Sequence, residues 1–115
     1  GICQDEIFGP LVSIISVKGF DEAIRVANSV SYGLSSAIYT SDMNKAFRAV
    51  NEIEAGLTYI NSSTIGSEVH LPFGGVKGTG NGAREAGIHG IDEFSEIKTV
   101  YFDYSGKLQR ATIDD

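Results

Sequence analysis

Apolar residues fill nearly every position from Leu11 to Val17, and beyond Gly19 they recur at helical spacing instead. The run L-V-S-I-I-S-V predicts a strand that is buried on both faces of a parallel sheet. Asp21 then has the character of an N-cap, and a helix is expected behind it. Its apolar positions are Ala23, Ile24, Val26 and Ala27. The Tyr-Gly pair at 32–33 is expected to end this helix.

A second helix follows with a strand on each side. Residues 36–40 and 57–60 predict short strands, and Asp42 predicts an N-cap between them. The apolar face of this helix consists of Met43, Ala46, Phe47, Val50 and Ile53. The order β-α-β-α-β requires two crossovers, which are nearly always right-handed and produce parallel strands. We therefore expect an α/β fold, a three-layer sandwich around a mainly parallel sheet.

Residues 62–90 form a long, polar, glycine-rich segment that holds both histidines. Seven of the fourteen glycines lie between positions 71 and 90. A loop of this length inside a compact domain is usually functional or disordered, and the histidines favour a function. A short helix is expected at 91–94. Strands are expected at 97–104 and 108–113, joined by a turn at 105–107 as a C-terminal β-hairpin.

The overall composition fits a soluble globular domain of 115 residues, with 42% hydrophobic and 21% charged residues. The net charge of −6 and the lack of a Lys/Arg cluster argue against a nucleic-acid partner. No apolar run approaches the roughly 20 residues needed to cross a membrane. A single cysteine suits a reducing, cytoplasmic setting. No signal peptide is visible, but the chain starts with Gly, so a missing leader says little about a longer natural chain.

Cys3 is the first candidate for chemistry, and an ordinary cysteine is the preferred interpretation. A nucleophilic thiolate needs a helix N-terminus, a cation or a histidine base, whereas Cys3 precedes the acidic pair Asp5 and Glu6. Together with His70 and His89 it shows no metal-ligand spacing, so no metal site is expected.

The stretch Gly78-Thr79-Gly80-Asn81-Gly82-Ala83 fits the dinucleotide-binding fingerprint G-x-G-x-x-(G/A). That fingerprint works between a strand and a helix, where backbone amides meet a pyrophosphate. Here Pro-Phe-Gly-Gly precedes it, and more glycine follows. We therefore reject a dinucleotide site at this position and expect a loop that needs positive φ and close backbone approach.

The turn Glu6-Ile7-Phe8-Gly9-Pro10 leads into the first expected strand and allows two interpretations. The Glu6 carboxylate can accept hydrogen bonds from both hydroxyls of a ribose, and the Phe8 ring can pack on a flat heteroaromatic ring. Alternatively, Glu6 is a solvated side chain and Phe8 belongs to the core. The residues alone favour the second interpretation.

Two motifs, taken together, change the preference between these two interpretations of the turn. The turn at 6–10 and the stretch Pro72-Phe73-Gly74-Gly75-Val76-Lys77-Gly78-Thr79-Gly80 resemble the paired late motifs of the NAD(P)-dependent aldehyde dehydrogenase superfamily. The sequence between the two motifs is similar to the family as well, and so is the C-terminal stretch F-S-E-I-K-T-V-Y-F-D-Y-S. The resemblance covers essentially the whole chain and matches the C-terminal quarter of a protein that is usually several times longer.

The resemblance implies roles for three residues. Glu6 would hold the hydroxyls of the nicotinamide ribose, Phe8 would pack near the nicotinamide ring, and Phe73 would lie near the substrate tunnel. The loop at 62–70 would vary with the substrate. Residues 1–97 would belong to the catalytic domain, and residues 98–115 would supply an oligomerisation strand that pairs with a neighbouring subunit.

The departures from the family are equally informative. The family's nucleophilic cysteine follows a Gly-Gln pair well upstream of the E-x-F-G-P motif, whereas Cys3 follows Gly1-Ile2 and lies three residues before Glu6. The general-base glutamate and the Rossmann domain also lie upstream in the family. No catalytic residue is therefore expected in this chain, and we expect it to be inactive alone.

The implied reaction of the complete enzyme oxidises an aldehyde, with a semialdehyde as one candidate, to a carboxylic acid with NAD or NADP through a cysteine thiohemiacetal. The implied partners are the aldehyde, the rest of the enzyme and neighbouring subunits of a homo-oligomer. The alternative is a non-enzymatic truncated module that docks onto full-length subunits. In either case the apolar strands need cover on both faces, so we expect the isolated chain to expose apolar surface and to self-associate.

Overall fold

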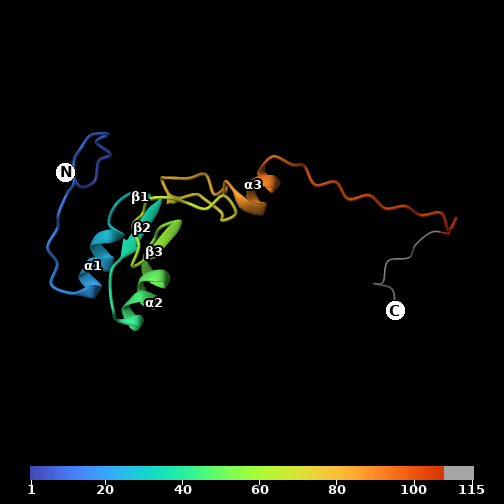
Figure 1. Cartoon of the computed structure of the whole chain (residues 1–115). Helices are drawn as coiled ribbons and strands as arrows, with labels where there is room; N and C mark the ends of the chain where they lie inside the picture. Colours follow the sequence, from blue (N-terminus) through green and yellow to red (C-terminus); the bar gives the residue numbers. More distant parts are fainter. Residues whose placement is uncertain (108–115) are drawn as a thin grey trace.

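A strand–helix–strand unit lies at the centre of the computed structural model, which describes residues 1–107. Strands β2 (Ser35–Ile38) and β3 (Leu57–Ile60) pair in parallel, with Ser35 opposite Leu57 and Ile38 opposite Ile60. Helix α2 (Met43–Glu52) connects them (Figure 1). The sequence prediction of this parallel crossover is confirmed.

Helix α2 begins where its N-cap was expected. The Asp42 carboxylate accepts hydrogen bonds from the backbone N–H groups of Asn44 (2.9 Å) and Lys45 (3.3 Å). These bonds satisfy two donors that the first turn of a helix leaves without partners. The buried hydrophobic residues among those described are Ala46 and Ala49, both on this helix. Helix α2 therefore packs closely only through small side chains.

Helix α1 (Phe20–Ala27) starts earlier and ends earlier than the sequence suggested. Its N-cap is Gly19, and Asp21 lies inside the first turn, so the predicted N-cap is wrong by two residues. The helix ends at Ala27 because the next residue, Asn28, turns its side chain to distant backbone. Its amide nitrogen donates to the Glu52 carbonyl at 2.7 Å, and its amide oxygen accepts from the Glu54 N–H at 2.9 Å. A contact between distant parts of the chain thus sets this boundary.

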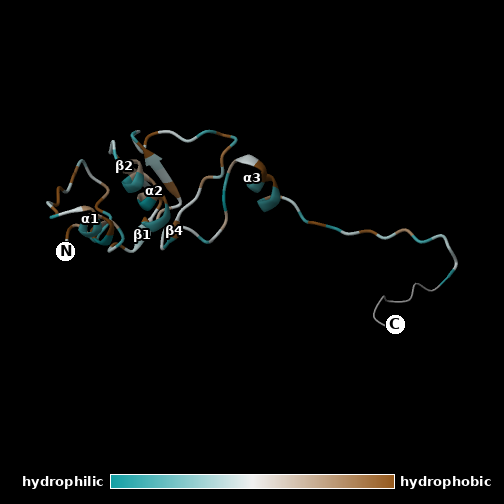
Figure 2. Cartoon of the chain, turned by 90° about the horizontal axis from the view of Figure 1, so that it is seen from below, coloured by the Kyte–Doolittle hydropathy of each residue, from teal (hydrophilic) through white to brown (hydrophobic). Residues whose placement is uncertain are grey.

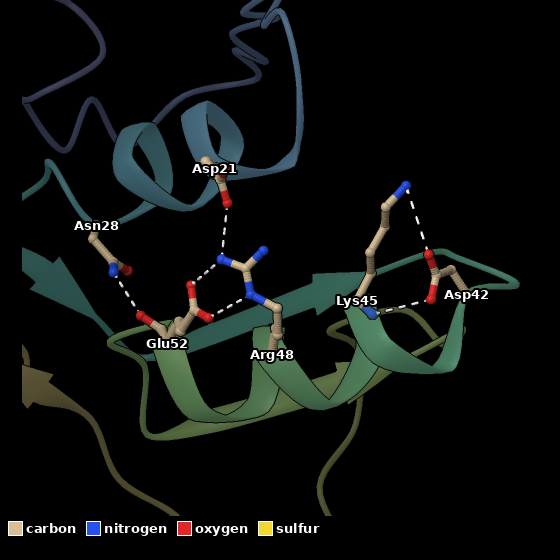
Figure 3. Close-up of polar contacts among 6 residues, drawn as sticks. All are labelled: Asp21, Asn28, Asp42, Lys45, Arg48 and Glu52. Carbon is tan, nitrogen blue, oxygen red and sulfur yellow. Dashed lines mark hydrogen bonds and ion pairs between the residues drawn. The ribbon is translucent and has the colours of Figure 1, made fainter.

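Helices α1 and α2 lie side by side and are joined by Arg48 (Figure 3). Its guanidinium donates to Asp21 at 2.8 Å and to both oxygens of Glu52 at 2.7 and 3.0 Å. It also lies over the Phe20 ring, 4.8 Å from the centroid. The hydrogen bonds to Glu52 and then to Asp21 raise the pKa of Arg48 above its usual value. The two helices therefore pack against each other, and the predicted three-layer sandwich is not confirmed within residues 1–107.

A second small sheet joins the middle of the chain to the glycine-rich segment. Strand β1 (Tyr32–Gly33) pairs antiparallel with β4 (Val76–Lys77). The pair at 32–33 therefore belongs to a strand and does not end α1. The described strands are grouped as two two-stranded sheets, so the predicted single, mainly parallel sheet is not confirmed for this part of the chain. Helix α3 (Gly87–Glu93) begins four residues before the helix expected at 91–94.

The segments 11–17 and 97–104 were expected to be strands, and this prediction is wrong for the described structure. Both lack regular secondary structure, and the backbone of 12–17 and 97–104 makes no hydrogen bond within residues 1–107. A strand exists only beside a neighbour, and none of the described segments lies beside these two. The strand expected at 108–113, and with it the hairpin, lies outside the described residues.

The molecule is elongated and exposes much apolar surface. Its radius of gyration is 22.0 Å, whereas a compact domain of this length has about 13 Å. Apolar stretches recur along the N-terminal segment, and along the chain after α3 they alternate with paler and hydrophilic ones (Figure 2). Ile14 and Ile97, for example, are 91% and 92% exposed. The prediction of exposed apolar surface is therefore confirmed.

Candidate functional site

The first candidate site is an open groove of about 400 Å³, lined entirely by residues 2–15. Glu6 and Phe8 both line it, together with Cys3, Asp5 and apolar side chains. The turn that carries them ends where the Leu11 N–H donates to the Gly9 carbonyl at 2.7 Å across Pro10. The structure thus brings Glu6 and Phe8 together on one short turn.

Phe8 has an unusual backbone conformation for a bulky residue. Its φ is +52°, in the left-handed region where most side chains are disfavoured by about 1–2 kcal/mol. Its side chain is 90% exposed, so it is not a core residue within the described part of the chain. A strained backbone that presents an aromatic ring to solvent is typical of a residue placed for contact with another group.

The charge of this groove favours one kind of ligand group over another. Its lining contains the carboxylates of Asp5 and Glu6 and no Lys, Arg or His side chain. Such a surface repels phosphate but accepts hydrogen bonds from hydroxyl groups. The charge of the groove therefore favours a ligand group that carries hydroxyls over one that carries phosphate.

Phe73, the third predicted site residue, lies in a different place. It is half-buried and forms an antiparallel bridge with Glu85, in which each N–H donates to the other's carbonyl at 2.7 Å. It lines a separate depression of about 530 Å³ between the glycine-rich segment and α3. Phe73 shares no groove with Glu6 and Phe8 within residues 1–107. The structure therefore does not join the three predicted residues into one site.

Glycines allow three backbone segments to cross at close range beside this second depression. A Cβ on Gly56 would lie 1.7 Å from the Gly74 carbonyl oxygen, and one on Gly33 would lie 2.4 Å from the Glu54 carbonyl oxygen. The crossing is held by the Gly56 N–H, which donates to the Gly33 carbonyl at 3.0 Å. Within the stretch 78–83, a Cβ on Gly80 would lie 2.8 Å from the Gly75 carbonyl oxygen and Gly82 has a φ of +98°, so the expected close approach and positive φ are confirmed there.

Lys77 connects this crossing to the end of α1, a role that the sequence analysis did not identify. Its ammonium donates to the carbonyls of Asn28 (2.7 Å) and Val30 (3.2 Å) and pairs with the Glu54 carboxylate at 2.6 Å. Asn28 is the C-cap of α1, where a cation also interacts favourably with the helix dipole. The side chain of Lys77 therefore ties β4, the end of α1 and the turn before β3 together.

The other candidate features of the sequence have less structural support as functional sites. Cys3 is exposed in the first groove, and no group of three or more potential metal ligands gathers within residues 1–107. Strand β4 comes directly before residues 78–83, although its sequence context did not suggest a strand, and a loop separates these residues from α3, which begins at Gly87. Among the described helices, none has the length and apolar run that crossing a bilayer requires.

Comparison with known proteins shows what this arrangement resembles. The model of the aldehyde dehydrogenase family matches residues 1–100. An α-ketoglutarate semialdehyde dehydrogenase of Haloferax volcanii is 48% identical over 104 residues, which are 90% of this chain and 22% of that protein. An α-ketoglutaric semialdehyde dehydrogenase of Bacillus subtilis is 42% identical over 100 residues, 87% of this chain and 20% of that protein.

A solved structure shows the same conformation within a longer chain. The NAD-dependent aldehyde dehydrogenase of Sinorhizobium meliloti superposes on 94% of this chain with a TM-score of 0.84 and 36% identity. The matched part is 21% of that protein. The chain thus spans about a fifth of the length of the relatives it matches.

Proposed function

Because the chain belongs to the aldehyde dehydrogenase family, we propose that it is the C-terminal part of an enzyme that oxidises an aldehyde to a carboxylic acid with NAD or NADP. One aldehyde, one water and one oxidised cofactor yield one acid, one reduced cofactor and a proton. The relatives named for α-ketoglutarate semialdehyde favour a semialdehyde as the substrate. The single observation that carries the proposal is the family match over residues 1–100.

The acidic groove supports a role in cofactor binding. Glu6 accepts hydrogen bonds from the two hydroxyls of the nicotinamide ribose, and the exposed ring of Phe8 packs beside the nicotinamide. The bound nicotinamide supplies the hydride acceptor. Hydride transfer depends steeply on distance and angle, so these two residues act mainly on the rate. They contribute only modestly to cofactor affinity, because most of the cofactor's binding surface lies outside this chain.

Phe73 and the loop at 62–70 form the substrate side in this proposal. The loop leads directly into Phe73, and all of its residues are exposed. The reacting cysteine, the general base and the Rossmann domain come from elsewhere in the complete enzyme. The chain alone is therefore inactive, and Cys3 has no catalytic role.

Residues 98–115 supply an oligomerisation strand, and residues 1–97 belong to the catalytic domain. The exposed apolar side chains of 97–104 and their unpaired backbone support this division, because such a segment is stable only beside another strand. The rest of the enzyme would cover 11–17 in the same way and complete the layers missing here. A homo-oligomer in a cytoplasmic setting remains the prediction.

The same unpaired segment favours the second candidate function, a non-enzymatic module that docks onto full-length subunits. Gel filtration with the Bacillus subtilis relative tests it. Co-migration of the chain with that protein supports docking, and separate elution counts against it.

The enzymatic proposal is tested with a fusion, called here the fused enzyme. The complete 115-residue chain is joined to the part of the Bacillus subtilis relative that precedes its region of similarity. Aldehyde-dependent formation of NAD(P)H is measured for the fused enzyme, for the upstream part alone and for the chain alone.

We expect turnover only from the fused enzyme. Turnover by the chain alone at an ordinary enzymatic rate, about 1 per second or more, would refute the claim that it is inactive alone. A fused enzyme that is no more active than the upstream part would contradict the proposed function.

A further inference from the structure

At the carboxyl ends of the parallel strands β2 and β3, the side chain of Asn61 forms hydrogen bonds that join the two chain segments. Its amide oxygen accepts from the Thr40 N–H at 2.8 Å, and its amide nitrogen donates to the Thr40 carbonyl at 3.0 Å. Its own N–H donates to the Ile38 carbonyl at 2.8 Å. The side chain thus continues the pairing of the two strands as a further peptide group would.

Asn61 also sets the direction in which the chain leaves the sheet. Its φ is +53°, in the left-handed region, which Asn tolerates better than most residues. The chain therefore turns sharply at the end of β3 and enters the loop at 62–70. In open α/β sheets, ligands bind outside the carboxyl ends of parallel strands, which is where this loop begins.

Tyr59, a residue of strand β3, connects the same loop to the sheet. Its hydroxyl donates to the Gly66 carbonyl at 2.6 Å, and Gly66 has a φ of +90° that favours glycine. Tyr59 is half-buried on β3, so the bond joins the middle of the loop to a strand. At the far end, the Gly87 N–H donates to the Val69 carbonyl at 2.9 Å. The loop is therefore held at its start, middle and end.

The loop presents apolar side chains outward while it is held in this way. Ile65 is 87% exposed and Val69 is 85% exposed. They come just before Phe73, the residue placed on the substrate side. A loop with fixed backbone and exposed apolar side chains can discriminate between substrates by shape.

We propose that Tyr59 and Asn61 are positioning residues that fix the loop at 62–70 and thereby set which aldehyde the enzyme prefers. The inference rests on the proposed function for its link to the aldehyde. The positioning itself rests on the hydrogen bonds to Gly66 and Thr40. Neither residue touches the cofactor groove, whose lining lies entirely within residues 2–15.

Hydrogen exchange in the fused enzyme tests the positioning without any need for activity. Tyr59→Phe removes a single hydroxyl. The amides of Asn61 and Gly87, which are hydrogen-bonded at the two ends of the loop, should then exchange about fivefold faster, the equivalent of about 1 kcal/mol. Asn61→Gly keeps the backbone conformation accessible but removes both side-chain bonds, so it should accelerate exchange at least as much. Tyr39→Phe is the matched control, because Tyr39 is 68% exposed and its hydroxyl has no hydrogen bond within residues 1–107. Unchanged exchange in both loop variants would overturn the inference.

Kinetics of the same variants test the link to the substrate. Tyr59→Phe should change the ratio of kcat/KM between α-ketoglutarate semialdehyde and acetaldehyde by about threefold or more and leave the KM for NAD(P)+ unchanged. A merely structural role would lower the active fraction and leave the ratio unchanged. Faster exchange with an unchanged ratio would overturn the specificity claim. If the fused enzyme is inactive, the proposed function fails, and the exchange result alone decides whether these residues position the loop.

Discussion

Replacing Lys77 with methionine should release strand β4 from the helices, at a local cost of about 2 kcal/mol. The ammonium has three acceptors, the carbonyls of Asn28 and Val30 and the carboxylate of Glu54. The Glu54 side chain is 58% exposed, so this ion pair contributes only about 0.5 kcal/mol. Hydrogen bonds to a charged donor contribute about 1.5–3 kcal/mol when shielded. The Lys77 side chain keeps 22% exposure, so we assign about 1.5 kcal/mol to the two carbonyl bonds together.

Hydrogen exchange of the fused enzyme measures this cost at the backbone crossing. The informative amides are those of Gly56, which donates to Gly33, and Gly78, which donates to Ser31 at 2.9 Å. A loss of about 2 kcal/mol raises the local opening constant about 30-fold, and exchange at these amides should accelerate by that factor.

Lys45→Met is the matched control for the loss of a lysine. Lys45 is 51% exposed, and its nearest carboxylate oxygen, on Asp42, lies 3.9 Å away, so its removal should change exchange at the crossing by less than about twofold. Exchange in Lys77→Met within about threefold of the unmodified protein would refute the assigned role, and so would equal effects of the two variants.

Three further predictions follow from the packing and the exposed surface. Gly56→Ala should lower the stability of the fused enzyme by about 3 kcal/mol or more, because a Cβ there overlaps a backbone carbonyl. Gly90→Ala inside α3 is the control and should be neutral or stabilising. Thermal denaturation followed by circular dichroism compares the two variants, and equal effects would contradict the close backbone crossing at Gly56. Asp42→Ala should cost about 1 kcal/mol at the start of α2, seen as about fivefold faster exchange in its first turn, and Asp42→Asn should restore most of the protection if capping is the cause. The isolated chain should self-associate with rising concentration in analytical ultracentrifugation, and a compact monomer at high concentration would argue against the exposed apolar surface described here.

Some local signals in the sequence predicted local structure correctly, whereas Asp21 did not mark the N-cap of α1. Asp42 identified the start of α2, and the short strands on both sides of that helix pair in parallel as expected. The turn at 6–10 could be read as a site because its residues are contiguous and its glycine and proline limit its shape. The cap and the turn depend on residues a few positions apart, and the parallel pairing follows from the strand–helix–strand order.

Features that depend on distant residues were not predicted. The run at 11–17 has strand composition, but a strand forms only beside another strand, and none is available within residues 1–107. The early end of α1 depends on the bonds of Asn28 to backbone 24 and 26 positions away. The role of Lys77 likewise depends on acceptors near positions 28, 30 and 54. Spacing along the chain carries no signal for such contacts.

The most direct test of the account compares Glu6→Gln with Asp5→Asn in the fused enzyme. Both carboxylates line the same groove, and each substitution removes one negative charge. If Glu6 orients the nicotinamide ribose, Glu6→Gln should lower kcat about tenfold or more while the Kd for NAD(P)+ stays within about threefold, and Asp5→Asn should leave both unchanged. Equal kinetics for the two variants would contradict the assignment of this groove to the cofactor.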